Sequence, residues 1–298
     1  MVDVRQRAPI RVGLAGWDYP DWDGIVYPRK RSRGFDKLRW IARFVESIEI
    51  NSSFYRPVRP AVAETWVRRT ESAAGFRFTA KAHRSWTHEI APDLDIAVRD
   101  TLDGLHPLRD AGCLGALLVQ FPQRYHWTPA AADHLERLAA RCAGWPLVVE
   151  VRHRSWESGP AEEQLRRLGI GWCVVDQPLA SRTTIQRLDR LTSGVGYLRL
   201  HGRNHDRWFD PDAGRDERYD YRYSPAELEP LADVARELAG RAEEVFVVQN
   251  NHFRGQALAN ALQLRHLFEG EKPRSPQGLV ETFPDLATDV QAERETLF

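Results

Sequence analysis

Four apolar runs of this chain end with two polar or ionisable residues spaced two positions apart. The pairs are Glu49/Asn51, Lys81/His83, Glu150/Arg152 and Arg199/His201. A carboxylate or imidazole at such a position could transfer protons, a lysine amine could act as a cation or nucleophile, and an arginine could bind a carboxylate or phosphate. Because residues i and i+2 of a β-strand point to the same face, each pair should face one way and its apolar neighbours the other. These neighbours are Ile48, Ile50, Phe78, Ala80, Val149, Val151, Leu198 and Leu200.

The predicted catalytic residues are Glu150, Lys81, Glu49 and His201. Glu150 is the first candidate for a general acid or base: burial would raise its pKa and Arg152 would lower it, and a structural Glu–Arg pair is the alternative. Glu49 is the second candidate base. Lys81 is a candidate Schiff-base amine if it is desolvated; otherwise it is a cation that holds an anionic or hydroxyl-rich ligand, or a partner of Glu49.

A second set of residues, at or just beyond the ends of the same runs, is expected to bind substrate. Arginines suit an anionic group, amides suit hydroxyl or carbonyl groups, and aromatic rings can stack on a ring or sugar face. The alternative for each is a structural role, as part of an ion-pair network, a turn cap or the core. The residues are Trp17, Tyr19, Asn51, Tyr55, His88, Arg152, Trp156, Asp176, Arg199, Asn250 and Asn251.

No cofactor is expected from the sequence motifs. The chain contains no GxGxxG, GxxxxGK[ST], HExxH or GxSxG pattern, which argues against dinucleotide, P-loop, zincin and serine-hydrolase chemistry. A divalent metal could be held by Glu49, Asp176 and His201 if they share one shell, although no ligand spacing marks such a site.

These residues need a framework that brings strand ends together. Eight strands are predicted, at 10–16, 47–51, 76–82, 115–121, 146–152, 171–176, 196–202 and 244–250. Helical spacing is found at 35–45, 61–72, 95–109, 129–142, 160–168, 224–240 and 254–269, whereas 177–195 is poorly patterned. This alternation predicts an α/β fold, a single (β/α)8 TIM-type barrel of eight parallel strands with its working site at the C-terminal mouth.

The same pattern predicts the domain organisation. We expect one domain over 1–298, with the barrel at about 10–270 and a C-terminal extension at 271–298. The polar and aromatic segment 201–223 should form a long loop after the seventh strand.

Composition limits the class of partner. Lys+Arg and Asp+Glu are balanced at 42 each, so net charge does not support a general nucleic-acid or membrane-surface role. The apolar runs are no longer than strands, the first ten residues lack the apolar segment of a signal peptide, and the three cysteines lie far apart. We therefore expect a cytoplasmic protein with a small-molecule substrate and without a membrane partner.

Seven ordered motifs resemble those of the DUF72 family, also called YecE-like or UPF0759. They are GLAGWDYPDWDGIVYP, FVESIEINSSFYRP, FRFTAKAHRSWTHE, LLVQFP, VVEVRHRSW, YLRLHGR and VVQNNHFRGQALANALQL, and they extend from about residue 11 to residue 269. The resemblance implies a TIM-type barrel of unassigned activity, related to sugar isomerases in fold. It also implies functional importance for Gly16, Gly202, Asn260 and most of the site residues named above. Leu14, Ala15 and Gln249 depart from the family pattern, so a hydroxyl role before Gly16 and one aromatic wall are in doubt.

Two functions are compatible with these observations. The first is an enzyme that acts on a small polar substrate, sugar-like or anionic, by acid–base chemistry of the isomerase or hydrolase type. The second is a non-catalytic ligand- or nucleic-acid-binding protein, suggested by the arginines and aromatic residues of 203–222. Acidic residues interrupt that segment, so nucleic acid is not the expected partner.

Overall fold

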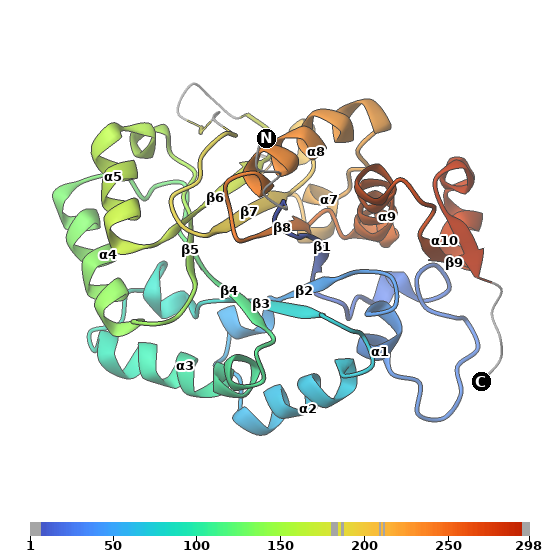
Figure 1. The fold of residues 1–298 in the computed structure, drawn as a ribbon, viewed down its shortest axis with the longest axis horizontal. Coiled ribbons are helices and arrows are strands. Elements are labelled where there is room, and N and C mark those ends of the chain that lie inside the picture. The colour runs from blue at the N-terminus through green and yellow to red at the C-terminus, as the bar shows by residue number, and fades with distance from the viewer. Residues whose placement is uncertain (1–6, 180–183, 186–187, 209, 211, 294–298) are drawn as a thin grey trace, which may run out of the picture.

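The computed structural model describes residues 7–179, 184–185, 188–208, 210 and 212–293. Eight parallel strands pair in chain order and close into a barrel, with β1 hydrogen-bonded to β8 (Figure 1). The strands are β1 Ile10–Ala15, β2 Ser47–Ile50, β3 Arg77–Lys81, β4 Leu114–Gln120, β5 Leu147–Glu150, β6 Gly171–Asp176, β7 Val195–Leu200 and β8 Glu244–Gln249. The predicted TIM-type barrel is thereby confirmed.

Helices surround the strands. In Figure 1, α4 and α5 lie on the left, α2 and α3 at the bottom, α8 at the top and α9 on the right. The helices are α1 Lys37–Ile41, α2 Pro60–Thr70, α3 Leu94–Asp110, α4 Pro129–Arg141, α5 Gly159–Leu168, α8 Pro225–Ala239 and α9 Gln256–Glu269. Most of them are amphipathic and bury one face, whereas α9 is buried on all sides from Gln256 to Leu264. A capping box starts α8: Ser224 and Glu227 exchange hydrogen bonds between side chain and backbone.

Three connections between strands depart from a regular strand–helix alternation. The helix predicted at 35–45 is shorter, because Asp36 caps it by accepting from Arg39 N (3.0 Å) and the chain turns after Ile41 toward β2. Between β6 and β7, the residues with described positions form no helix; Thr184 makes an isolated bridge with His153. The long loop after β7 contains two single-turn helices, α6 His205–Trp208 and α7 Arg215–Arg218.

Strand residues alternate between two cores, as the pairs of the four runs predict. The apolar residues predicted to face away from the polar pairs all lie in the larger core between strands and helices. The smaller core fills the barrel interior and consists of Ala15, Ala116, Leu118, Val148, Cys173, Val175, Tyr197, Phe246 and Val248. The pleat thus separates a helix-facing apolar surface from an inward surface.

The interior is filled rather than open. Tyr197 and Phe246 are fully buried with ring centroids 5.9 Å apart, and a Cβ on Gly115 would lie 2.1 Å from Phe246 Cζ. Toward the N-terminal ends of the strands, Glu244 pairs with Arg11 and, at 3.4 Å, with Arg77. The barrel is therefore a packed core with a polar group at each end, not a channel.

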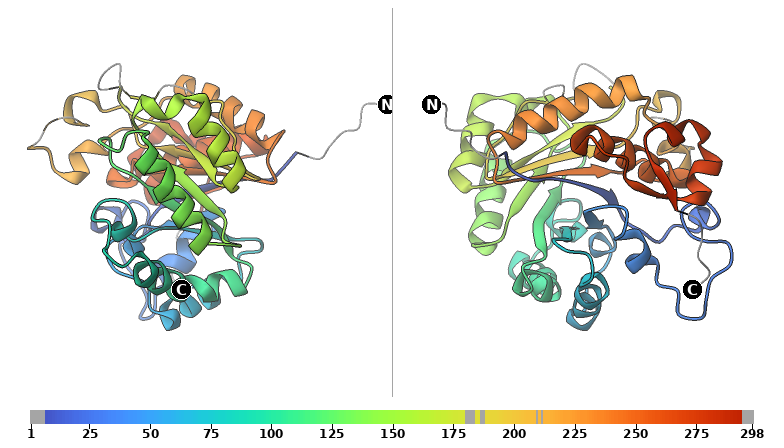
Figure 2. Two further views of the ribbon diagram at one scale, coloured as in Figure 1. Left: turned by 90° about the vertical axis from the view of Figure 1, so that its left-hand side faces the viewer. Right: turned by 45° about the vertical axis from the view of Figure 1, so that its right-hand side comes forward.

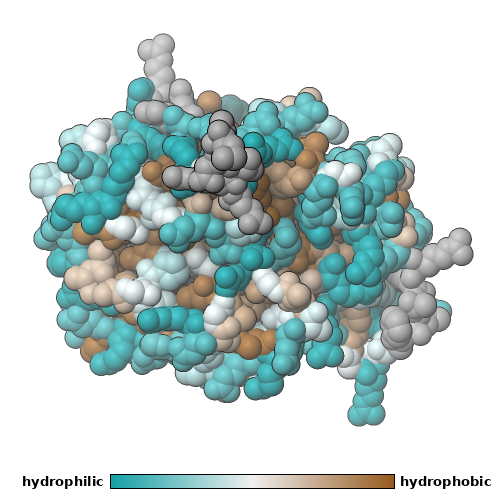
Figure 3. Space-filling model, in the orientation of Figure 1, coloured by the Kyte–Doolittle hydropathy of each residue, from teal (hydrophilic) through white to brown (hydrophobic). Residues whose placement is uncertain are grey.

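The segment after α9 packs beside the loop that follows β1 (Figure 2). Its elements are β9 Arg274–Pro276, α10 Gln277–Thr282 and β10 Gln291–Glu293, with β9 and β10 paired in parallel. Gly278 allows close approach, because a Cβ there would lie 2.7 Å from Gly24 O. In Figure 3, hydrophilic residues line most of the edge of the molecule, and hydrophobic residues are seen mainly toward its centre. In the described part of the chain, no helix combines the length and apolar character needed to cross a membrane.

Candidate active site

Inward-facing side chains at the C-terminal ends of the strands are mostly polar. They come from β2, β3, β4, β5 and β7 and from residues that directly follow β5, β7 and β8. We refer to them as the polar cluster: Glu49, Lys81, Gln120, Glu150, Arg152, Arg199, His201 and Asn250.

Arg199 joins two buried glutamates at the centre of this cluster. Its Nη2 donates to Glu49 Oε1 at 2.6 Å, and its Nη1 donates to Glu150 Oε2. Arg199 is 2% exposed and both glutamates are fully buried. Burial alone would lower the pKa of the Arg199 guanidinium, but the two carboxylates raise it well above its usual value. The group therefore stays charged, and the ion pairs compensate its desolvation.

Glu49 is held in place from its other oxygen by a tyrosine. Tyr197 OH donates to Glu49 Oε2 at 2.8 Å and lies 2.7 Å from Thr79 Oγ1. Burial, and then the charge of Glu49, raise the pKa of Tyr197 well above its usual value, so the phenol remains a donor. With donors on both oxygens, Glu49 is fixed below the mouth rather than directed toward it.

Removing the Tyr197 hydroxyl should destabilise the protein. Tyr197→Phe takes one donor from a buried carboxylate, and we expect the free energy of unfolding to fall by about 1–3 kcal/mol. Tyr125→Phe is the matched control, because its hydroxyl makes only a long contact of 3.5 Å with Ala131 O. Urea denaturation of both variants measures the effect, and equal losses in the two would contradict the assigned role.

Glu150 accepts hydrogen bonds from two arginines. Arg152 donates to Oε1 through Nε (2.9 Å) and Nη2 (2.7 Å), and Arg199 donates to Oε2. Burial would raise the pKa of Glu150, but Arg199, Arg152 and the nearby His201 ring hold it well below the usual range. A carboxylate with such a low pKa is a weak proton acceptor near neutral pH. Its contacts fit an anchor for the arginines better than the predicted general base.

His201 is a fully buried imidazole between an amide and the Glu150–Arg152 pair. Its Nδ1 is 2.8 Å from Asn250 Nδ2, and its Nε2 is 3.5 Å from Arg152 Nη2 and 3.7 Å from Glu150 Oε1. Burial lowers the pKa of His201 to about 3, in spite of the nearby Glu150 carboxylate. His201 is therefore neutral near pH 7, and because Nδ1 accepts from the Asn250 amide, its Nε2–H faces the Glu150 carboxylate.

Lys81 differs from the other cations of the cluster, because no described carboxylate lies within ion-pair distance of it. Its Nζ donates to Gln120 Oε1 at 3.0 Å and lies 4.1 Å from the centroid of the Phe54 ring. Burial, and then the charge of Arg199, lower the pKa of the Lys81 amine to about 8. The side chain is nevertheless only partly buried, so it can meet a ligand.

Two other predicted residues, His88 and Tyr55, contact the same phenylalanine ring as Lys81. The His88 ring meets the Phe54 ring edge to face, with centroids 5.1 Å apart, and Tyr55 contacts Phe54 at the same separation. Burial, and then the charge of Lys81, lower the pKa of His88. Trp17 and Asn51 are half-buried and Tyr55 is 69% exposed, which leaves their side chains accessible.

Asp176 does not join the polar cluster. It accepts from Arg203 Nη2 at 2.8 Å and from Tyr223 OH at 2.6 Å, on the helix-facing side of β6. The alternative in which Glu49, Asp176 and His201 share one metal shell is not supported, because no three His, Cys, Asp or Glu side chains of the described residues are grouped to hold a metal. Arginines engage both carboxylates instead of a metal.

Three more predicted binding residues have structural contacts outside the cluster. The Tyr19 hydroxyl donates to a backbone carbonyl of β1. Trp156 is fully buried, and its Nε1 donates to Tyr125 O at 2.8 Å. Asn251 is fully buried and donates to Asn260 Oδ1 at 2.9 Å. These contacts favour a structural role for the three side chains, in support of the loops around the mouth, over direct contact with a substrate.

Several residues of the site were not predicted from the sequence. Tyr197 and Thr79 lie two positions before Arg199 and Lys81, so strand alternation alone would have placed them on the same inward face. The Tyr219 ring meets the Trp208 ring edge to face, with centroids 5.5 Å apart, and both rings lie beside His201. No sequence pattern marks Tyr219 as a site residue.

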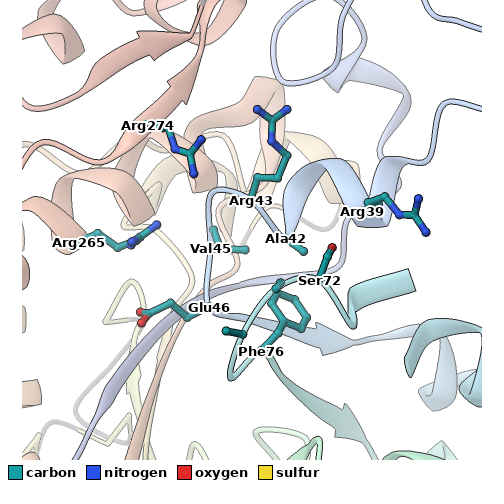
Figure 4. A pocket seen from close by; sticks show the side chains of 11 residues that line it. Arg39, Ala42, Arg43, Val45, Glu46, Ser72, Phe76, Arg265 and Arg274 are labelled. Carbon is teal, nitrogen blue, oxygen red and sulfur yellow. The ribbon is translucent and has the colours of Figure 1, made fainter. Parts of the chain in front are cut away.

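A separate cavity of about 370 Å³ lies at the opposite end of the barrel, before β2 and β3 (Figure 4). Four arginines surround it: Arg39, Arg43, Arg265 and Arg274. Arg43 and Arg274 both pair with Glu293, and Arg265 pairs with Glu269 at 2.7 Å. Carboxylates thus already neutralise much of this charge, and in barrels of this type the N-terminal end usually serves stability.

Comparisons with known proteins agree with the fold. A family model described as "Protein of unknown function DUF72" matches residues 11–282. The UPF0759 protein YunF of Bacillus subtilis (strain 168) is 32% identical over 276 residues, which are 88% of this chain and 95% of YunF. The UPF0759 protein YecE of Escherichia coli (strain K12) is 27% identical over 164 residues, 54% of this chain and 55% of YecE. A crystal structure of a DUF72 family protein from Thermotoga maritima MSB8 is 31% identical, covers 88% of this chain and 99% of that one, and superposes with a TM-score of 0.75.

Proposed function

Because the chain belongs to the DUF72 family, whose description assigns no activity, we propose a function from the polar cluster itself. The protein is an enzyme that acts on a small polar substrate, sugar-like or anionic, by acid–base chemistry at the C-terminal end of the barrel. Side chains from several strands meet there, which is where barrels of this type carry their catalytic groups.

One observation carries the proposal: the cations of the cluster outnumber its carboxylates by one. Lys81, Arg152 and Arg199 are balanced only by Glu49 and Glu150, and His201 is neutral near pH 7. An unbalanced charge at a partly buried position is costly unless a ligand of opposite charge completes it. The excess therefore supports a carboxylate or phosphate group on the substrate.

The contacts suggest a division of roles among these residues. Arg152 is fixed by Glu150 through Nε and Nη2, and its Nη1 makes no hydrogen bond to a described residue, so Nη1 can donate to the substrate anion. Lys81 can stabilise developing negative charge or transfer a proton, because its pKa of about 8 is close to neutral pH. His88, with a lowered pKa, is a neutral imidazole suited to accept a proton. Glu150 positions Arg152.

The arginines of the loop after β7 do not favour the nucleic-acid alternative. Arg203 pairs with Asp176 at 2.8 Å, Arg207 with Asp210 at 3.1 Å and Arg222 with Asp285 at 2.6 Å. Cations that are already paired offer little to a phosphate backbone.

A ligand screen with matched variants tests the proposed function. Wild type and Arg152→Ala are compared by thermal shift and calorimetry with sugars, sugar phosphates, 2-oxo acids and nucleotides. Loss of a charged hydrogen bond should weaken the affinity for a responding anion by about 10- to 100-fold. The control is Arg274→Ala, whose side chain is 64% exposed at the other end of the barrel. If no compound in the panel stabilises the wild type, or if the two variants bind equally well, the proposal is contradicted.

A further inference from the structure

Lys81 is the last residue of β3, and its environment suits a reactive amine better than a structural cation. Strand alternation directs it into the barrel mouth, on the same face as Thr79. Its described partners, Gln120 and the Phe54 ring, are both uncharged. The three other lysines, Lys30, Lys37 and Lys272, lie on the outside of the barrel, and Lys37 pairs with Asp18 at 2.6 Å.

The positive charges near Lys81 favour its neutral form. Arg199 and Arg152 both lower the pKa of Lys81, while Glu150 and Glu49, whose charges oppose this effect, are occupied by the arginines. Desolvation beside another cationic group is a recognised way to activate a lysine as a nucleophile. The amine is also partly exposed, which a nucleophile requires.

We propose that Lys81 forms a Schiff base with the carbonyl group of a small anionic aldehyde or ketone. This inference rests on the proposed function and names the substrate class. The Arg152 guanidinium, held by Glu150, binds the anionic group of the same molecule and brings its carbonyl carbon to Lys81 Nζ.

The step balances without an added oxidant or reductant. The neutral amine attacks the carbonyl carbon, a C–N bond forms as the C=O π bond breaks, and one proton passes from the nitrogen to the former carbonyl oxygen. The resulting carbinolamine takes up a second proton on that oxygen and loses it as water, which leaves an iminium ion. We assign this proton exchange to His88, whose ring contacts Phe54 as the Lys81 amine does and responds to the Lys81 charge. The iminium then acidifies the adjacent C–H bond, which fits isomerase-type proton transfer.

Reductive trapping tests the inference. The full-length protein is incubated with sodium cyanoborohydride and one probe at a time: pyruvate, dihydroxyacetone phosphate or uncharged dihydroxyacetone. Peptide mass mapping then locates the alkylated lysines. We expect an anionic probe to modify Lys81 at least about tenfold faster than Lys30, Lys37 or Lys272, because the pKa of Lys81 is lowered to about 8 and the cluster arginines can hold the anion beside it. Lys81→Arg should abolish the fast modification, and Lys272→Arg should not change it.

The outcomes separate this inference from the proposed function. If Lys81 is modified faster than the other lysines, and if Arg152→Ala slows this modification, both the Schiff base and the proposed function are supported. If an anionic probe binds the wild type by calorimetry and Lys81 is modified no faster than the other lysines, the Schiff base is overturned while the proposed function stands. If no probe binds and Lys81 is not selectively modified, the inference is overturned, and the ligand screen above decides the proposed function separately.

Discussion

Replacing Arg199 with methionine is expected to destabilise the protein by about 3–5 kcal/mol, because the change leaves the buried carboxylate of Glu49 without its cation. Arg199 donates to both Glu49 and Glu150, and each of these carboxylates is fully buried. Methionine fills much of the same space, so the lower free energy of unfolding results from the missing charge and not from a cavity. A loss of this size is a large fraction of the stability of an ordinary domain. Urea denaturation near neutral pH measures it.

Two controls identify the cause of the loss. Arg274→Met removes an exposed cation and should change stability by less than about 1 kcal/mol. The combination of Arg199→Met with Glu49→Gln should recover much of the loss, since Glu49 then carries no charge and Glu150 keeps its ion pair with Arg152. If the double variant is no more stable than Arg199→Met, the destabilisation has another origin.

The effect should also depend on pH. Arg199 and Arg152 hold the pKa of Glu150 well below the ordinary value, so the ionised carboxylate stabilises the wild type above that ordinary value. This contribution is lost as the pH falls through the lower pKa of the folded state. The difference between wild type and Arg199→Met should therefore become smaller in acid.

Lys81→Met is expected to have the opposite effect, a gain in stability of about 3 kcal/mol near neutral pH. The pKa of Lys81 falls from 10.5 in an exposed lysine to about 8 in the folded protein, so folding disfavours the charged amine. Below pH 8 the full cost is present, and it disappears as the pH rises toward 10.5, because the unfolded chain then loses its proton as well. Methionine carries no charge and avoids this cost.

Denaturation of wild type and Lys81→Met between neutral and alkaline pH measures the gain. Lys272→Met is the matched control, because Lys272 is exposed and should leave stability unchanged. A Lys81→Met variant that is less stable than wild type near neutral pH would show that the contacts with Gln120 and Phe54 outweigh desolvation. A residue that lowers stability and is retained is characteristic of a functional site.

The inward position of Glu49, Lys81 and the pairs Glu150/Arg152 and Arg199/His201 could be predicted from the sequence, because the pleat of a strand has a period of two residues. The remaining members, Asn51 and His83, lie beyond their strands at the start of single turns and do not join the polar cluster. The same rule explains the misplacement of Asp176, which was assigned to the mouth from its position at a strand end. Cys173 and Val175 face the interior, so Asp176 must face the helices, where Arg203 binds it.

The pairing within the polar cluster could not be predicted. Which carboxylate meets which arginine depends on the distance across the closed barrel, and β2, β5 and β7 are far apart in the sequence. The role of Glu150 changed for this reason: the sequence shows one arginine beside it, whereas the fold adds Arg199 and His201. Similarly, nothing in the sequence brings Phe54 under the amine of Lys81.

The pairing of β1 with β8 has a consequence for biosynthesis. The register joins Ile10 to Val245 and Leu14 to Gln249, so the first strand of the barrel hydrogen-bonds with the eighth. Until residue 249 has emerged from the ribosome, the backbone N–H and C=O groups on one side of β1 have no strand partner. The nascent chain thus carries an unprotected strand edge until β8 has been made, and the ring cannot close earlier.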